Sequence, residues 1–124
     1  MNYLIDCWRV LSALREYYSY SETDAELIPI CESTARELTA RVKPNADCSD
    51  IRLINAAAAM ANHRLCIRKL HSDEAVTSFK AGDVTVSVSP AALTENAEKE
   101  KTRAIIAALP LLRDEEFLFR QVSI

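Results

Sequence analysis

Cysteine and histidine are the residue types in this chain that most readily support catalysis or metal binding. The cysteines are Cys7, Cys31, Cys48 and Cys66. No two of them form a C-x-x-C pair, which is the usual spacing of a redox or zinc site. His63 and His71 are eight residues apart, about two helical turns, which is too far along one helix for both to bind the same ion. We therefore expect no metal site, and structural or surface roles for these side chains.

The sequence contains none of the common catalytic motifs. It has no glycine-rich phosphate loop, no G-x-S-x-G and no H-E-x-x-H sequence, and its carboxylates are scattered. No group of cysteine, histidine and acid is suggested by local order. We therefore expect a protein that is not an enzyme, has no cofactor and works by contact.

The composition predicts one helical domain. The chain has 124 residues, 49% of them hydrophobic, so it is long enough for a single core. It contains one glycine, which favours a helical fold. The net charge of −3 argues against a general nucleic-acid binder. No apolar run has the length of a membrane span, and Asp6 interrupts the apolar stretch that a signal sequence would need. Reduced cysteines then favour assembly in the cytoplasm, without membrane contact.

The strongest predicted helix runs from Asp47 to Leu70, with Asp47 or Ser49 as its N-cap. Helical spacing puts five residues on one face, namely Ile51, Ile54, Ala58, Ala61 and Leu65. The run of four alanines at 56–59 also supplies Ala56, Ala57 and Ala59, which spread small side chains around much of the remaining circumference. This helix can be approached closely from several sides, so we expect it to be the central helix of a small bundle.

Two helices are predicted before it. The first runs from Tyr3 to Glu16, with Leu4, Trp8 and Leu11 on its inner face. The second covers 25–42 and has alternative N-caps at Ser19, Ser21, Thr23 and Asp24. Its apolar face consists of Leu27, Cys31, Ala35, Leu38 and Val42. Pro29 favours a late start of this helix or a kink in it.

A last helix is predicted after residue 89. Ser89 is its expected N-cap, Pro90 occupies the first helical position, and the helix ends near Leu109, before Pro110. The inner face consists of Leu93, Ala97, Ala104, Ile105 and Ala108. Acidic and basic residues cover the opposite face, which we interpret as solvated.

Residues 77–88 are the β-like segment of the chain. Val84, Val86 and Val88 alternate with polar residues, and Gly82 can take the positive φ of a turn. The residues expected to form this hairpin include Phe79, Lys80, Gly82, Asp83, Val84 and Val86. Because an isolated hairpin is marginal in water, we expect it to lie on the helices or to pair with a neighbouring subunit.

The segment 114–124 is predicted to be an extended arm beyond a single domain of residues 1–113. An acidic triplet, 114–116, precedes an apolar cluster that is too short to form a stable helix alone. The residues that would contact a partner are Phe117, Leu118, Phe119, Arg120 and Val122. The arm either folds back on its own domain or docks on another chain, with Phe117, Phe119 and Arg120 as the anchors.

Taken together, these motifs resemble one family. The order is a Pro-Asn-Ala-Asp turn, an Ile-Asn-Ala-Ala-Ala-Ala helix, a Phe-Lys-Ala-Gly-Asp-Val-Thr-Val hairpin, an acidic-basic helix and a Phe-Leu-Phe-Arg-Gln-Val tail. Across about residues 23–122, this order resembles the head-tail connector proteins of tailed phages and prophages, also called adaptor or head-completion proteins.

The resemblance implies a mainly α fold of about four helices with a short hairpin and a C-terminal arm. It further implies a structural virion protein at the head-tail interface. Such subunits form a ring, dodecameric in the family, beneath the portal of the DNA-filled capsid. The expected partners are other copies of the chain, the portal protein and the next connector or stopper protein, while DNA passes through the channel without sequence-specific binding.

A small DNA-binding phage regulator is the alternative. Its recognition helix would include Arg64, Arg68 and Lys69, but the segment 50–80 has a net charge of only +2, from five basic and three acidic residues. No helix-turn-helix turn is evident.

Overall fold

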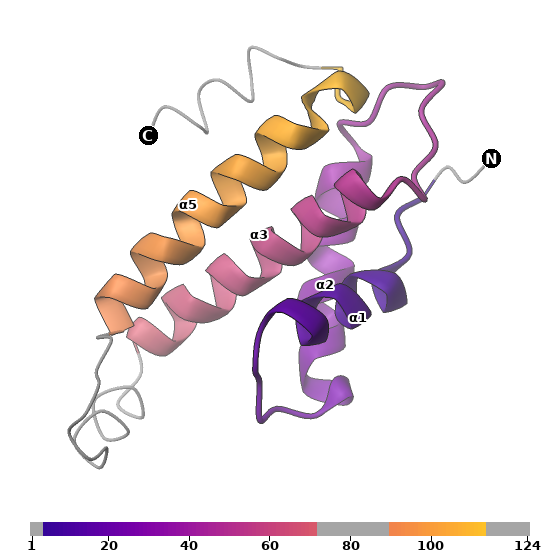
Figure 1. Cartoon of the computed structure of the whole chain (residues 1–124). Helices are drawn as coiled ribbons and strands as arrows, with labels where there is room; N and C mark the ends of the chain where they lie inside the picture. The colour runs from indigo at the N-terminus through magenta and orange to yellow at the C-terminus, as the bar shows by residue number, and fades with distance from the viewer. Residues whose placement is uncertain (1–3, 72–89, 114–124) are drawn as a thin grey trace.

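The computed structural model describes residues 4–71 and 90–113, and these residues are mainly helical. The helices are α1 (Cys7–Tyr17), α2 (Asp24–Thr39), α3 (Ile51–Leu70) and α5 (Pro90–Ala108), and a 3-10 turn, η1 (Leu109–Leu111), follows α5. Together they form a small helical bundle, as the sequence predicts (Figure 1). The predicted hairpin, the Ser89 cap and the C-terminal arm lie outside the described residues.

Helix α3 is the centre of the bundle. It packs against α1, α2 and α5, and α5 runs alongside it in the opposite direction (Figure 1). All residues from 56 to 62 are buried, so neighbours cover α3 around most of its circumference. This arrangement confirms that the alanine-rich helix is approached closely from several sides. Small side chains permit this because they keep the helix narrow.

The start of α3 differs from the prediction. Asp50 is the N-cap, and its side chain accepts a hydrogen bond from the backbone N–H of Arg52. Asp47 instead accepts from the N–H of Ser49, in the turn before the helix. The prediction that Ile51 belongs to the buried face was wrong. Ile51 is the first helical residue and is exposed, because the buried part of α3 begins at Leu53.

Helix α1 starts later than predicted and buries a different face. Asp6 caps it by accepting from the N–H of Trp8, so Leu4 precedes the helix and Trp8 falls in its first turn. Both of these apolar side chains are exposed, contrary to the prediction, whereas Leu11 is buried as predicted. The buried residues of this region are Ile5, Val10, Leu11, Ala13 and Leu14.

Helix α2 begins at its Thr23 cap, and the helix continues through Pro29. Of the two alternatives given for Pro29, the late start is therefore wrong, and the kink stays a prediction. Pro29 lies on the exposed side of the helix, and the Ala25 carbonyl that loses its N–H partner also belongs to an exposed residue, so water can replace that hydrogen bond. The predicted apolar face is confirmed, since Leu27, Cys31, Ala35, Leu38 and Val42 are all buried. Val42 lies three residues beyond the helix end.

Helix α5 buries most of its predicted inner face. Ala97, Ile105 and Ala108 are buried and Ala104 is half-buried, but Leu93 is 50% exposed, which contradicts the prediction. The reason is its position: Leu93 lies in the first turn of α5, at the end where the α3–α5 pair extends past α1 and α2 (Figure 1).

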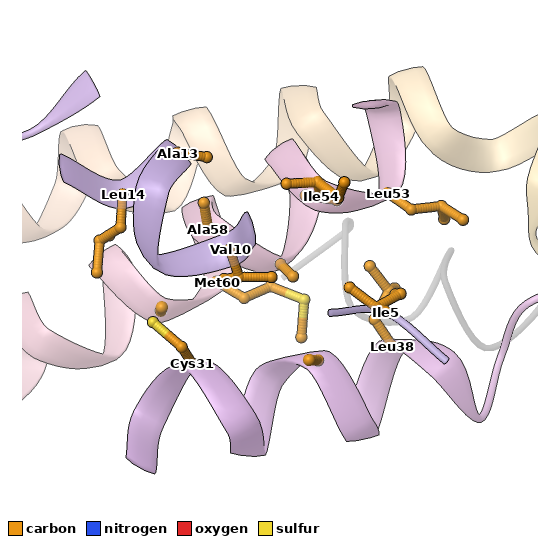
Figure 2. Packing of buried hydrophobic residues seen from close by; sticks show 14 of the residues in the cluster. Ile5, Val10, Ala13, Leu14, Cys31, Leu38, Leu53, Ile54, Ala58 and Met60 are labelled. Carbon is orange, nitrogen blue, oxygen red and sulfur yellow. The ribbon is translucent and has the colours of Figure 1, made fainter. Parts of the chain in front are cut away.

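One contiguous core joins these helices. Figure 2 shows Val10 and Leu14 of α1, Leu38 of α2, and Ile54 and Met60 of α3 converging between the helices. The described members of the core cluster run from Ile5 to Leu112. Cys31 and Cys48 belong to it, in agreement with their predicted role as small apolar residues.

Candidate functional site

The end of the described chain is held firmly against the α2–α3 connection. Val42 and Leu112 form an isolated antiparallel bridge. The N–H of Lys43 donates to the carbonyl of Leu111 at 2.8 Å, and the N–H of Arg113 donates to the carbonyl of Arg41 at 2.9 Å. The Arg113 guanidinium adds a hydrogen bond to the carbonyl of Ala40 at 2.6 Å. We call residues 111–113 with residues 40–43 the C-terminal anchor.

Local sequence explains this anchor. Pro110 lacks the N–H that an α-helix would use, and the chain tightens into η1 directly after α5. Leu112 then takes extended backbone angles and is fully buried. It is the last described member of the core, so the chain is fixed up to the residue before the acidic triplet 114–116.

The N-terminal segment lies beside the same connection. The N–H of Ile5 donates to Oγ1 of Thr39, in the last turn of α2, at 3.1 Å, and Ile5 is buried. The guanidinium of Arg9 reaches the carbonyl of Ser49, just before α3, at 3.1 Å. Both ends of the described chain therefore meet at the α2–α3 connection.

The residues predicted from sequence to contact partners belong to two segments. The arm residues are Phe117, Leu118, Phe119, Arg120 and Val122, and the hairpin residues are Phe79, Lys80, Gly82, Asp83, Val84 and Val86. All of them lie outside the described residues. The structure does describe the anchor, which ends at the residue before the predicted arm, and it describes the ends of α3 and α5 that flank the hairpin segment in the sequence.

The cysteines lack the features of reactive thiols. All four are free, and burial raises the pKa of each, to about 11 for Cys31. A raised pKa keeps a thiol protonated at neutral pH, where it is a weak nucleophile. Within residues 4–71 and 90–113, no three histidine, cysteine or acidic side chains are grouped so that they could hold a metal ion.

Two of the three cations considered for a DNA-reading helix form ion pairs inside the domain. Arg64 forms an ion pair with Glu37 and donates to Oγ of Ser33 at 3.2 Å. Lys69 pairs with Glu22 at 3.5 Å, and its ammonium lies 5.1 Å from the centre of the Tyr20 ring. Arg68 is exposed. The pairing leaves little free positive charge on this part of α3.

The α1–α2 linker carries contacts that the sequence analysis missed. The Tyr18 hydroxyl donates to Oε2 of Glu100 at 2.6 Å, and the Tyr20 hydroxyl donates to Oδ1 of Asn62. Burial is the largest cause that raises the pKa of both phenols. The three tyrosines in YYSYSETD were a signal of this role, because a tyrosine can bury its ring while its hydroxyl finds a polar partner. Through these two hydroxyls, the α1–α2 linker contacts both α3 and α5.

Comparison with family models, with curated proteins and with solved structures gave no match. Among the described helices, none combines the length and the apolar character that crossing a bilayer requires.

Proposed function

We propose that this chain is a head-tail connector, or adaptor, of a tailed phage or prophage. In this proposal it is a structural virion protein without enzymatic activity. Copies of it form a ring under the portal, and the ring joins the DNA-filled capsid to the tail. The C-terminal arm contacts the portal or the neighbouring subunit, and the opposite face of the ring receives the next connector or stopper protein.

The C-terminal anchor is the observation that carries this proposal. A described core extending from Ile5 to Leu112 is followed by an apolar segment whose point of departure is fixed by backbone hydrogen bonds. A fixed departure point lowers the entropy that the arm loses when it binds, because fewer orientations are open to it. Phenylalanine and arginine, which the arm contains, are among the residue types enriched in protein interfaces.

Charge supports passive passage of DNA. The chain has a net charge of −3, and Arg64 and Lys69 are engaged with carboxylates of the same domain. A protein that neutralises few phosphates can line a channel without holding the duplex. The same pairing weighs against the regulator alternative, which needs free cations on one helix.

Binding to the portal protein encoded in the same genome tests the proposal. The full chain is mixed with that portal, and complexes are measured by size-exclusion chromatography with light scattering. We expect a complex with the wild-type chain, whether or not the chain alone is a monomer. Replacing both arm phenylalanines, Phe117→Ser with Phe119→Ser, should abolish the complex. The matched control is Ile106→Ser, which also removes an exposed apolar side chain but from the surface of α5.

Three outcomes count against the proposal. The first is a genome that encodes no portal protein, and the second is a wild-type chain that forms no complex with the portal. The third is a wild-type chain that binds duplex DNA tightly in the same buffer while ignoring the portal, which favours the regulator. If the arm variant binds as well as Ile106→Ser, the role given to the arm is wrong.

A further inference from the structure

A small polar pocket lies where three helices meet, away from the C-terminal anchor. It has a volume of about 120 Å³ and is lined by Glu37, Met60, His63, Arg64 and Lys101. A water molecule occupies about 30 Å³ in the liquid, so the pocket has room for a group of about four such volumes. It is therefore large enough for a compact ion but too small for a folded peptide segment.

Helices α2, α3 and α5 each contribute side chains to the lining of the pocket. Met60, His63 and Arg64 lie three and four residues apart on α3, so they share one face of that helix. Glu37 comes from α2 on one side, and Lys101 comes from α5 on the other. Because the three helices pack on the common core, the positions of these side chains are set by the fold.

The pocket holds more donors than the domain uses. Arg64 forms an ion pair with Glu37 and donates to Ser33, yet a guanidinium carries five N–H donors. Lys101 has three donors, and no ion pair joins it to a carboxylate of residues 4–71 or 90–113. With His63 neutral, the two cations and one carboxylate of the lining leave a net charge of +1.

The net charge of +1 already includes the negative charge of Glu37. The Glu37 carboxylate is paired with Arg64 and fixes the guanidinium in position, so the uncompensated charge is that of Lys101. Arginine and lysine together suit a phosphate, since arginine supplies directed donors and lysine a compact charge. A neutral imidazole adds one further donor through its N–H.

We propose that this pocket binds a small phosphate-containing anion, with inorganic phosphate as the simplest case. The Arg64 guanidinium, held by Glu37, and the Lys101 ammonium provide the charge, and His63 provides the third side. This proposal does not depend on the role of the C-terminal arm.

The pKa of His63 can be used to measure whether an anion occupies the pocket. Burial is the main cause that lowers this pKa; Lys101 and, to a lesser extent, Arg64 lower it further, while Glu98 of α5 acts in the opposite direction. Glu37 of α2 lines the same pocket. A bound dianion beside the ring stabilises the imidazolium and must raise this pKa. The chain has one other histidine, His71, which lies at the end of α3 and provides an internal reference.

The test is an NMR titration of both histidines in the full chain, with and without millimolar inorganic phosphate at constant ionic strength. We expect phosphate to raise the pKa of His63 and to leave that of His71 unchanged. A second arm replaces phosphate with a short DNA duplex. A His63 shift with phosphate supports the proposal, whereas an equal shift with the duplex would show that the pocket holds the DNA backbone, which contradicts passive passage of DNA.

Two lysine variants of α5 distinguish phosphate binding in the pocket from a general attraction of phosphate to positive charge on the protein. Lys101→Gln should weaken phosphate binding about tenfold, because it removes a charge-assisted hydrogen bond. Lys99→Gln removes the same charge from an exposed position that does not line the pocket, and it should bind as the wild type does. The proposal is overturned if phosphate does not move the pKa of His63, if the duplex moves it equally, if the pKa of His71 moves equally, or if both variants bind alike. Far-UV circular dichroism verifies that both variants are folded.

Discussion

At the scale of single residues, the account depends on the alanines of α3. Ala57 and Ala58 are 0% and 1% exposed. Replacing either with leucine inserts three heavy atoms into a packed interior, and we expect Ala57→Leu or Ala58→Leu to destabilise the domain by roughly 1 to 3 kcal/mol. Urea unfolding followed by circular dichroism at the helical band measures this change.

An alanine on the surface of α5 provides the matched control. Ala107 is exposed, so Ala107→Leu makes the same chemical change without crowding a neighbour and should shift stability by less than about 0.5 kcal/mol. If the α3 variants are as stable as this control, the small side chains of α3 are not enclosed by the other helices, and the central position of α3 is wrong.

At the scale of elements, the start of α3 has a measurable pH dependence. Hydrogen bonds from the Arg52 side chain, and then from its backbone N–H, hold the pKa of Asp50 below its ordinary value. A carboxylate whose pKa is lower in the folded state stabilises the protein above the pKa of the unfolded chain, which is about 3.9. That stabilisation is lost as the pH falls through the folded value.

Asp50→Ala should therefore cost about 1 kcal/mol at neutral pH, which is typical of a lost N-cap. The difference from wild type should start to shrink below about pH 4, the pKa of the unfolded chain, and should disappear as the pH falls through the lower pKa of Asp50 in the folded protein. Asp50→Asn keeps a capping oxygen and should remain closer to wild type at neutral pH. Chemical unfolding at a series of pH values gives the free energy of unfolding of all three proteins. If Asp50→Ala loses the same stability at every pH, the ionised carboxylate is not what stabilises the helix start.

The packing of α5 on α3 can be tested with adjacent isoleucines. Ile105 is 2% exposed and Ile106 is 49% exposed, although they are neighbours on the same helix. Ile105→Ala should destabilise the domain by about 2 to 5 kcal/mol, because it removes buried methyl groups and leaves a cavity. Ile106→Ala should have a much smaller effect. Equal losses in the two variants would mean that α5 packs with a different face.

The sequence predicted the helices well because their apolar spacing is regular. The five predicted apolar positions from Leu27 in α2 to Val42 just beyond it repeat every three or four residues and are all buried, and the alanine run of α3 has no competing interpretation. The errors fall at helix ends. Leu4, Trp8, Ile51 and Leu93 continue an apolar pattern, but each lies in or before a first turn, beyond the reach of the neighbouring helices. The spacing of apolar residues shows which face of a helix is apolar. It does not show at which residue the neighbouring helices cease to cover that face.

Contacts between distant segments were beyond what the sequence could predict. The Val42–Leu112 bridge joins residues 70 positions apart, and the pocket combines Glu37, His63 and Lys101 from three helices. None of these pairs has a local spacing that indicates the contact. The tyrosine-rich linker was noticeable in the sequence, but its partners Asn62 and Glu100 depend on how the helices pack.

At the scale of the whole molecule, the proposed function gives different roles to the residues before and after the end of the anchor. Backbone hydrogen bonds and the buried Leu112 fix the chain up to Arg113, and the acidic and apolar arm sequence begins at the next residue. If the helices supply the stability of the domain and the arm supplies its attachment, then folding and assembly can be lost independently of each other.

A chain that ends at Arg113 tests this division most directly. Its free energy of unfolding and its binding to the portal protein are measured in parallel with those of the full chain. We predict that the shortened chain has a free energy of unfolding within about 0.5 kcal/mol of the full chain, inside the range of ordinary surface changes, and forms no detectable portal complex. A shortened chain that fails to fold, or one that still binds the portal, would contradict the account.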